Sequence, residues 1–195
     1  MTTSCSNRTM PALALSLCAL ALSACGGSDG NNAKALDLTI LHINDHHSHL
    51  DAESTTLTLK NAAGASQTVT VELGGFARVT AAIEALAGAS KNVLKLHAGD
   101  AITGDLYFTQ SEGKADADMM NTVCFDAFSI GNHEFDSANA GLVKFIDYLH
   151  AGTCKTPVLS ANIQPAAGSP LASRMGSYKI IEKDGEKIGV VGLTV

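Results

Sequence analysis

The fold of this chain is decided by the stretch Ser129-Ile130-Gly131-Asn132-His133-Glu134-Phe135-Asp136. The apolar residues 127–130 predict a short buried strand that ends at the following glycine, and a helical pattern begins a few residues later. Asn132 and His133 therefore stand where a strand passes into a helix, which is where open α/β folds carry their chemistry. Taken alone, the stretch can also be an ordinary helix start with Asp136 or Ser137 as its N-cap.

Two similar polar clusters lie upstream, each after a predicted strand. Residues 36–43 lead to Asp45 and His47, and residues 92–96 lead to Asp100. In an α/β sheet these strand ends converge. Carboxylate, imidazole and amide oxygen together suit divalent first-row metals such as Zn, Mn or Fe. Because a carboxylate can bridge two ions, the pattern predicts a two-metal site of the kind that hydrolyses phosphate esters.

His133 has a carboxylate, Asp136, three residues further on. Such a neighbour can orient the imidazole or raise its pKa. The protonated ring is then able to stabilise charge that develops on phosphoryl oxygens.

The rest of the chain alternates strand and helix patterns, which indicates an α/β layered domain. Two hairpins are predicted, at 55–72 and 178–193, and a fourth strand at 157–161. Two amphipathic helices are predicted, one over 74–88 and one whose apolar positions repeat with helical spacing; these positions are Leu142, Phe145, Ile146 and Leu149. A short helix is expected around 118–123, with Met120 in the core.

The composition is that of an ordinary globular protein, with 195 residues, 46% hydrophobic and 16% charged. The formal net charge is -6 and there is no run of Lys or Arg, which argues against a nucleic-acid polymer as a partner. A small anionic substrate is not excluded, because metal ions can supply positive charge locally.

The first 25 residues are expected to be a signal sequence and not part of the fold. An apolar run over 11–22 follows the single charge at Arg8 and ends in Leu22-Ser23-Ala24-Cys25, which resembles a bacterial lipobox. Cys25 would then carry lipid, residues 26–35 would form a flexible tether, and the protein would reside in the cell envelope as a periplasmic or outer-membrane lipoprotein. The alternative is an ordinary secretory signal that is cleaved nearby.

Cys124 and Cys154 remain in the mature part, in an oxidising compartment. Each lies just before a predicted strand, so neighbouring parallel strands would bring both to the same end of the sheet. A disulfide is the favoured interpretation, and two buried free thiols are the alternative.

The three strand-end clusters together resemble the calcineurin-like metallophosphoesterases; they are residues 43–47, 97–100 and 131–136. Residues 159–163 and 188–194 narrow the resemblance to the bacterial periplasmic 5′-nucleotidase and UDP-sugar hydrolase branch. The resemblance covers the chain from about Leu36 to its last residue. It implies a four-layer α/β/β/α sandwich with mixed sheets, of which this chain would hold a part.

The resemblance also implies roles for individual residues. Two divalent ions of the Zn, Mn, Co or Fe class would be bound, one by Asp45 and His47 and the other by Asn132, with Asp100 as the bridge. His133 and Asp136 would form the pair that stabilises the transition state. The implied substrate is a nucleotide or another small phosphate ester.

The sequence departs from the family in one respect. Thr-His-like and Gly-His-x-His-like motifs, which supply further metal ligands, and the nucleoside-binding domain are absent from these 195 residues. We therefore expect the amino-terminal part of a longer enzyme, or a truncated product with weak or no activity. The alternatives are a 2′,3′-cyclic-nucleotide phosphodiesterase, a UDP-sugar hydrolase, or a non-catalytic surface lipoprotein that binds metal or nucleotide. The oligomeric state is not predicted.

Three further histidines lie near the predicted site. His46 and His49 flank His47, and a strand end can aim only some of three neighbours at one point. Both are expected to support the site or to face solvent. His97 is expected to be a hydrogen-bonded histidine beside the site and not a ligand.

Overall fold

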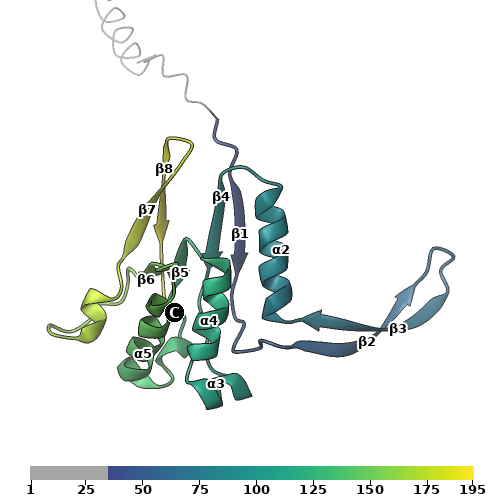
Figure 1. Cartoon of the computed structure of the whole chain (residues 1–195), viewed down its shortest axis with the longest axis horizontal. Coiled ribbons are helices and arrows are strands. Elements are labelled where there is room, and N and C mark those ends of the chain that lie inside the picture. Colours follow the sequence, from purple (N-terminus) through teal and green to yellow (C-terminus); the bar gives the residue numbers. More distant parts are fainter. Residues whose placement is uncertain (1–34) are drawn as a thin grey trace, which may run out of the picture. The chain divides into compact units, whose positions relative to one another are not determined.

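The computed structural model describes residues 35–195, of which Leu36–Val195 form one compact unit. The predicted signal sequence, with Cys25, lies outside the described residues. A parallel sheet with strand order β1-β4-β5-β6 forms the centre of this unit (Figure 1); the strands are β1 Thr39–Ile43, β4 Val93–His97, β5 Ala127–Ser129 and β6 Val158–Leu159. Because all four run in the same direction, their carboxyl ends meet at one edge.

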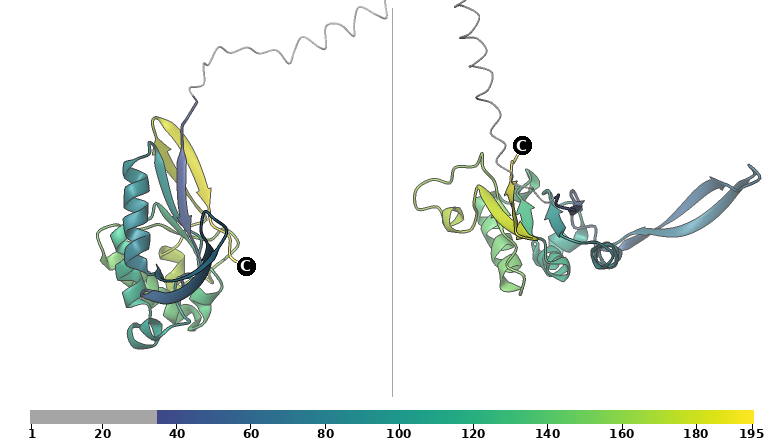
Figure 2. Two further views of the ribbon diagram at one scale, coloured as in Figure 1. Left: turned by 90° about the vertical axis from the view of Figure 1, so that its right-hand side faces the viewer. Right: turned by 90° about the horizontal axis from the view of Figure 1, so that it is seen from above.

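Helices α2, α4 and α5 lie on one face of this sheet (Figures 1 and 2); they span Phe76–Gly88, Lys114–Val123 and Ala138–Ala151. The apolar face predicted for the last helix is confirmed, since all four of its residues are fully buried in a core cluster that also contains Phe128 and Met120. In α2 Phe76 and Ile83 are buried, whereas Leu86 in the last turn is 52% exposed, so the predicted apolar face is only partly correct.

Both predicted hairpins are present, and each forms a two-stranded antiparallel sheet separate from the parallel sheet. The first pairs β2, Ala52–Lys60, with β3, Ser66–Gly74, and extends away from the sheet (Figure 2). The second pairs β7, Tyr178–Lys183, with β8, Glu186–Val191. The combination of a helix-covered parallel sheet with antiparallel hairpins confirms the predicted α/β class with mixed sheets.

Several boundaries differ from the sequence-based expectation. The predicted strand at 157–161 is reduced to two residues in β6, and the helix α3, Leu106–Ser111, was not predicted. The polar stretch after β5 enters a 3-10 turn, η2, at His133–Phe135, and α5 starts only after Ser137. A second 3-10 turn, η3, spans Pro170–Ser173. None of the helices in residues 35–195 combines the length and the apolar character needed to cross a membrane.

Cys124 and Cys154 are joined by a disulfide, with their Cα atoms 5.1 Å apart. Cys124 is the C-cap of α4, and Cys154 follows α5. Both precede neighbouring parallel strands, β5 and β6, so they lie at the same end of the sheet.

Candidate metal centre

Three loops at the carboxyl edge of the sheet are held together by hydrogen bonds from their backbone N–H groups. The N–H of Asp45, after β1, donates to the carbonyl of Gly99 at 3.0 Å, and that of His47 donates to the carbonyl of Asp100 at 3.2 Å. The N–H of His133, after β5, donates to Oδ1 of Asp100 at 2.9 Å. The loop after β4 therefore connects the other two loops.

This arrangement brings four of the predicted site residues together. Ligand atoms of His47, Asp100 and His133 all lie within 4.8 Å of one another. The rings of His47 and His133 stand nearly perpendicular, with centroids 4.9 Å apart. Oδ1 of Asp45 lies 3.7 Å from Nε2 of His47. The convergence expected from the strand-end pattern is thus present in the structure.

The other two predicted residues lie beside this cluster. Oδ2 of Asp136 lies 2.8 Å from Nδ1 of His133, so the two side chains form a pair across one turn. Asn132 is exposed between Gly131 and His133. Its side-chain amide makes no hydrogen bond to any residue within 35–195, so its metal-binding role stays a prediction.

The surroundings of Asp45 and His133 shift both of their pKa values in the direction that favours the charged form. A hydrogen bond from the Asn44 amide holds the pKa of Asp45 below its usual range, with a smaller contribution from His47. The hydrogen bond to Asp136 raises the pKa of His133 above its ordinary value. Because Nδ1 of His133 is engaged by Asp136, Nε2 is the ring nitrogen that remains for a metal or a substrate.

The donor set fits a divalent metal ion. The imidazole of His47 and the carboxylate of Asp100, with ligand atoms within 4.8 Å, provide the mixed nitrogen and oxygen ligands that first-row divalent metals prefer, and His133 lies beside them as a hydrogen-bond donor. A second carboxylate, that of Asp45, lies 3.7 Å from Nε2 of His47, and its lowered pKa favours the ionised form. The residues present are therefore suited to hold a metal at this edge.

The backbone at this edge adopts conformations that ordinary residues seldom take. Asp45, His47, Ser48 and Asp100 all have φ between 44° and 56°, in the left-handed region. Such residues cost on the order of 1–3 kcal/mol each and cluster at functional sites. A Cβ at Gly99, where φ is 100°, would lie 2.6 Å from the backbone nitrogen at position 131, so only glycine permits this close approach of two loops.

Sequence reasoning missed the role of Glu134, which is fully buried. Its carboxylate accepts hydrogen bonds from the backbone N–H groups of Asp100 at 3.0 Å, Ala101 at 2.7 Å and Gly131 at 2.6 Å. Burial raises the pKa of Glu134, while these donors act in the opposite direction. The only signal in the sequence was its place inside the polar stretch after β5.

The three nearby histidines have different roles. The His46 side chain is only 10% exposed and bonds to Asp116, so it supports the site from inside. His49 is 59% exposed and pairs with Asp105 at 3.0 Å. His97, the last residue of β4, is buried and hydrogen-bonded, as expected, and burial lowers its pKa well below the ordinary value.

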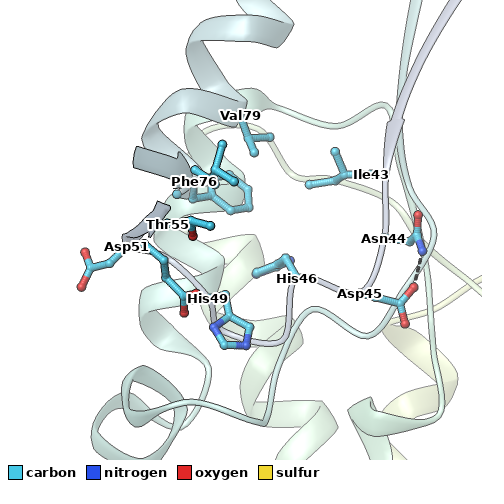
Figure 3. Close-up of a pocket in the computed structure, with 13 residues that line it drawn as sticks. Ile43, Asn44, Asp45, His46, His49, Asp51, Thr55, Phe76 and Val79 are labelled. Atoms are coloured by element: carbon cyan, nitrogen blue, oxygen red, sulfur yellow. Dashed lines mark hydrogen bonds between the residues drawn. The ribbon is translucent and has the colours of Figure 1, made fainter. Parts of the chain in front are cut away.

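A pocket of about 480 Å³ borders the cluster on the side of β1 and α2 (Figure 3). Apolar side chains such as Phe76 and Val79 line one part, and Asp45 lies at another part beside Asn44. Asp51 also lines this pocket. The acidic groups make this pocket unsuitable for a phosphate without a cation.

A family model described as calcineurin-like phosphoesterase matches residues 38–190. The chain belongs to this family. It is 46% identical over 174 residues to a probable 5′-nucleotidase of Treponema pallidum, which covers 89% of this chain and 28% of that protein. It is 48% identical over 160 residues to the NAD 5′-nucleotidase of Haemophilus influenzae, which covers 82% of this chain and 25% of that protein.

Solved structures agree with this membership. The Haemophilus influenzae NAD nucleotidase matches with a TM-score of 0.74 at 48% identity, over 83% of this chain and 30% of that one. A 5′-nucleotidase precursor of Thermus thermophilus matches with a TM-score of 0.67 at 34% identity, over 80% and 28%. The metallophosphoesterase fold expected from the sequence is thereby confirmed. The chain spans about a quarter of the length of the curated relatives that it matches.

Proposed function

We propose that this calcineurin-like phosphoesterase chain provides ligands of a two-metal site that hydrolyses phosphate esters of nucleotides, as in a 5′-nucleotidase. The observation that carries the proposal is the convergence of His47, Asp100 and His133 within 4.8 Å at the carboxyl edge of the sheet. The names of the relatives, which are 5′-nucleotidases, support the nucleotide as substrate class.

The proposed roles follow the sequence prediction. Asp45 and His47 would hold one divalent ion of the Zn, Mn, Co or Fe class, Asp100 would bridge, and Asn132 would hold the second. Bound divalent ions supply Lewis acidity and positive charge for the displacement at phosphorus. The residues of the chain fix the ligand directions through the backbone bonds between the three loops.

His133 is the proposed catalytic residue, and Asp136 holds its ring. With Nδ1 donating to Asp136, a protonated ring presents the Nε2 hydrogen to a phosphoryl oxygen. The pKa of His133 is raised, so the proton is fully present at low pH and is lost as the pH rises through that pKa. Activity should therefore fall on the basic side, and Asp136→Asn should move this fall to lower pH.

A hydrolysis assay with the purified chain tests the proposal. AMP, UDP-glucose and a 2′,3′-cyclic nucleotide are offered with Mn²⁺ or Co²⁺, and the preferred substrate separates the three related activities. His133→Ala should lower kcat by about 10²–10³-fold, the usual cost of losing one stabilising donor. His42→Ala, an exposed histidine on β1, is the matched control and should retain the wild-type rate.

Two results would contradict the proposal. If His133→Ala hydrolyses the substrate at the wild-type rate, His133 is not a catalytic residue. Binding of metal or nucleotide without any turnover would favour the alternative of a non-catalytic binding protein. Titration of metal per chain also tests whether one ion or two are held.

Export and lipid attachment at Cys25 are proposed separately, on the sequence pattern of residues 1–25. The disulfide between Cys124 and Cys154 supports an oxidising compartment. Mass spectrometry of the protein from membranes should show a lipid on Cys25 and none in Cys25→Ser. An unmodified Cys25, or cleavage at another residue, would contradict lipid attachment.

A further inference from the structure

Asp116, on α4, is fully buried directly behind the first ligand loop. Its Oδ1 lies 3.1 Å from Nε2 of His46, and its Oδ2 accepts the hydroxyl of Ser48 at 3.0 Å. These two residues alternate with Asp45 and His47, the residues that face the candidate metal centre. One carboxylate on a helix therefore holds both inward-facing residues of the loop.

The hydrogen bonds fix the protons in this network. The backbone N–H of Gly99 donates to Nδ1 of His97 at 3.2 Å, so the hydrogen of this neutral ring is on Nε2. That nitrogen lies 3.0 Å from Nδ1 of His46 and donates to it. His46 then carries its own hydrogen on Nε2 and donates to Asp116. Every polar atom of the two rings has a partner, and the direction of each bond is determined.

The network joins two of the three ligand loops. His97 belongs to the strand that ends just before Asp100, and His46 lies between Asp45 and His47. The ring of His46 also packs edge-on against Phe76 of α2, with centroids 5.1 Å apart. His46 is therefore fixed on three sides, by a strand, by α2 and by α4.

The loop needs such an anchor because its backbone is strained. Asp45, His47 and Ser48 have φ of 52°, 44° and 56°. Conformations of this kind persist only where surrounding contacts hold them. If the inward-facing residues were released, the loop would relax and the ligand side chains would turn away from each other.

We propose that Asp116 is a positioning residue that aims Asp45 and His47 at the metal through its hydrogen bonds to His46 and Ser48. This inference rests on the proposed metal-dependent function, and it assigns a task to a buried carboxylate that is not among the proposed metal ligands. Partners behind metal ligands commonly change metal affinity about 10–100-fold when they are lost.

The test compares Asp116→Leu with Asp116→Asn in the full chain, by titration with Co²⁺ alone and measurement of its visible absorption. Leucine removes both acceptors, so affinity should fall about 10–100-fold and the absorption bands should shift. Asparagine can accept from His46 with Oδ1 and donate to the Ser48 hydroxyl with Nδ2, so affinity and spectrum should stay close to wild type. This recovery by the conservative variant would not be expected if the buried charge itself were needed.

Asp118→Asn is the matched control, because Asp118 lies on the same helix but pairs with Lys114 on the surface. It should leave the Co²⁺ affinity and spectrum unchanged. Wild-type affinity and spectrum in Asp116→Leu would overturn the proposal, and so would equal losses in the leucine and asparagine variants.

If Asp116→Leu does not fold, His46→Phe and His46→Gln test the same connection. Glutamine can accept from His97 and donate to Asp116 and should retain the Co²⁺ spectrum, whereas phenylalanine should lose it. Wild-type Co²⁺ binding in His46→Phe would overturn the proposal. Failure of the proposed function can be told apart from failure of the Asp116 proposal. A wild type that binds Co²⁺ with the expected absorption but hydrolyses no nucleotide would refute the proposed function and not the positioning role of Asp116. A wild type that binds no Co²⁺ overturns both.

Discussion

At the scale of single residues, the candidate centre depends on side chains that accept hydrogen bonds from the backbone of its loops. Glu134 accepts only from backbone N–H groups, and these belong to the loops that carry Asp100 and Gly131. An acceptor-only carboxylate is the side chain that suits several converging donors. Because a buried N–H without a partner is costly, the loops are stable in this arrangement only while the carboxylate is present.

Glu134→Gln should therefore destabilise the fold and weaken metal binding. Glutamine keeps the shape of the side chain, but its amide N–H groups would face the backbone N–H donors, which should lower the free energy of unfolding by about 1–3 kcal/mol. Denaturant unfolding measures the change. Glu84→Gln, on an exposed position of α2, is the control and should change stability by less than about 0.5 kcal/mol. Unchanged unfolding of Glu134→Gln would show that its contacts are not needed.

At the scale of elements, α4 and α5 pack side by side and carry much of the core. Met120 of α4 and Phe145 and Leu149 of α5 are completely buried. The disulfide from Cys124 to Cys154 connects the carboxyl ends of these helices, with a sequence separation of 30 residues. It closes a loop that contains β5 and the stretch with His133.

Reduction of this disulfide should lower the stability of the chain. The loop-closure model gives about 3–4 kcal/mol for a loop of this length, because the cross-link restricts the unfolded chain. Thermal unfolding with and without a reducing agent measures the effect. The double variant Cys124→Ser with Cys154→Ser should unfold at the melting temperature of the reduced wild type, and the reducing agent should not change that temperature. Equal melting temperatures of the oxidised wild type and the double variant would contradict the expectation.

At the scale of the whole molecule, the centre is assembled from loops after three strands of the parallel sheet. Asp45 and Asp100 are 55 residues apart in sequence, and Asp100 and His133 a further 33. A ligand that binds all three loops therefore binds the folded unit and not the unfolded chain. Metal binding and global stability are coupled for this reason.

Addition of Mn²⁺ or Co²⁺ should therefore raise the melting temperature of the chain, and EDTA should reverse the rise. At a free metal concentration of a hundred times Kd the gain is about 2.7 kcal/mol. Asp100→Ala should abolish the shift, whereas Asp118→Asn, on the surface of α4, should preserve it. A shift of equal size in Asp100→Ala would place the bound metal elsewhere.

Much of the fold was predictable because its signals are local. The helical spacing of Leu142, Phe145, Ile146 and Leu149 gave the buried face of α5, and alternation gave both hairpins. The length of β6 was overestimated because an apolar run does not show at which residue the hydrogen bonding to the neighbouring strand ends. Leu86 was expected to be buried because it lies on the apolar face of α2, but it is exposed. Periodicity identifies such a face, and it does not show how far along the helix another element covers that face.

The sequence by itself determined which residues stand at the strand ends, and with them the chemistry of Asp45, His47, Asp100 and His133. Only the tertiary structure decided how these side chains are held. Glu134 and Asp116 act on backbone or side chains up to 70 residues away, and His46 turns inward because a buried carboxylate accepts its hydrogen. Spacing along a chain cannot reveal such partners, because their distance in space is set by how the strands and helices pack.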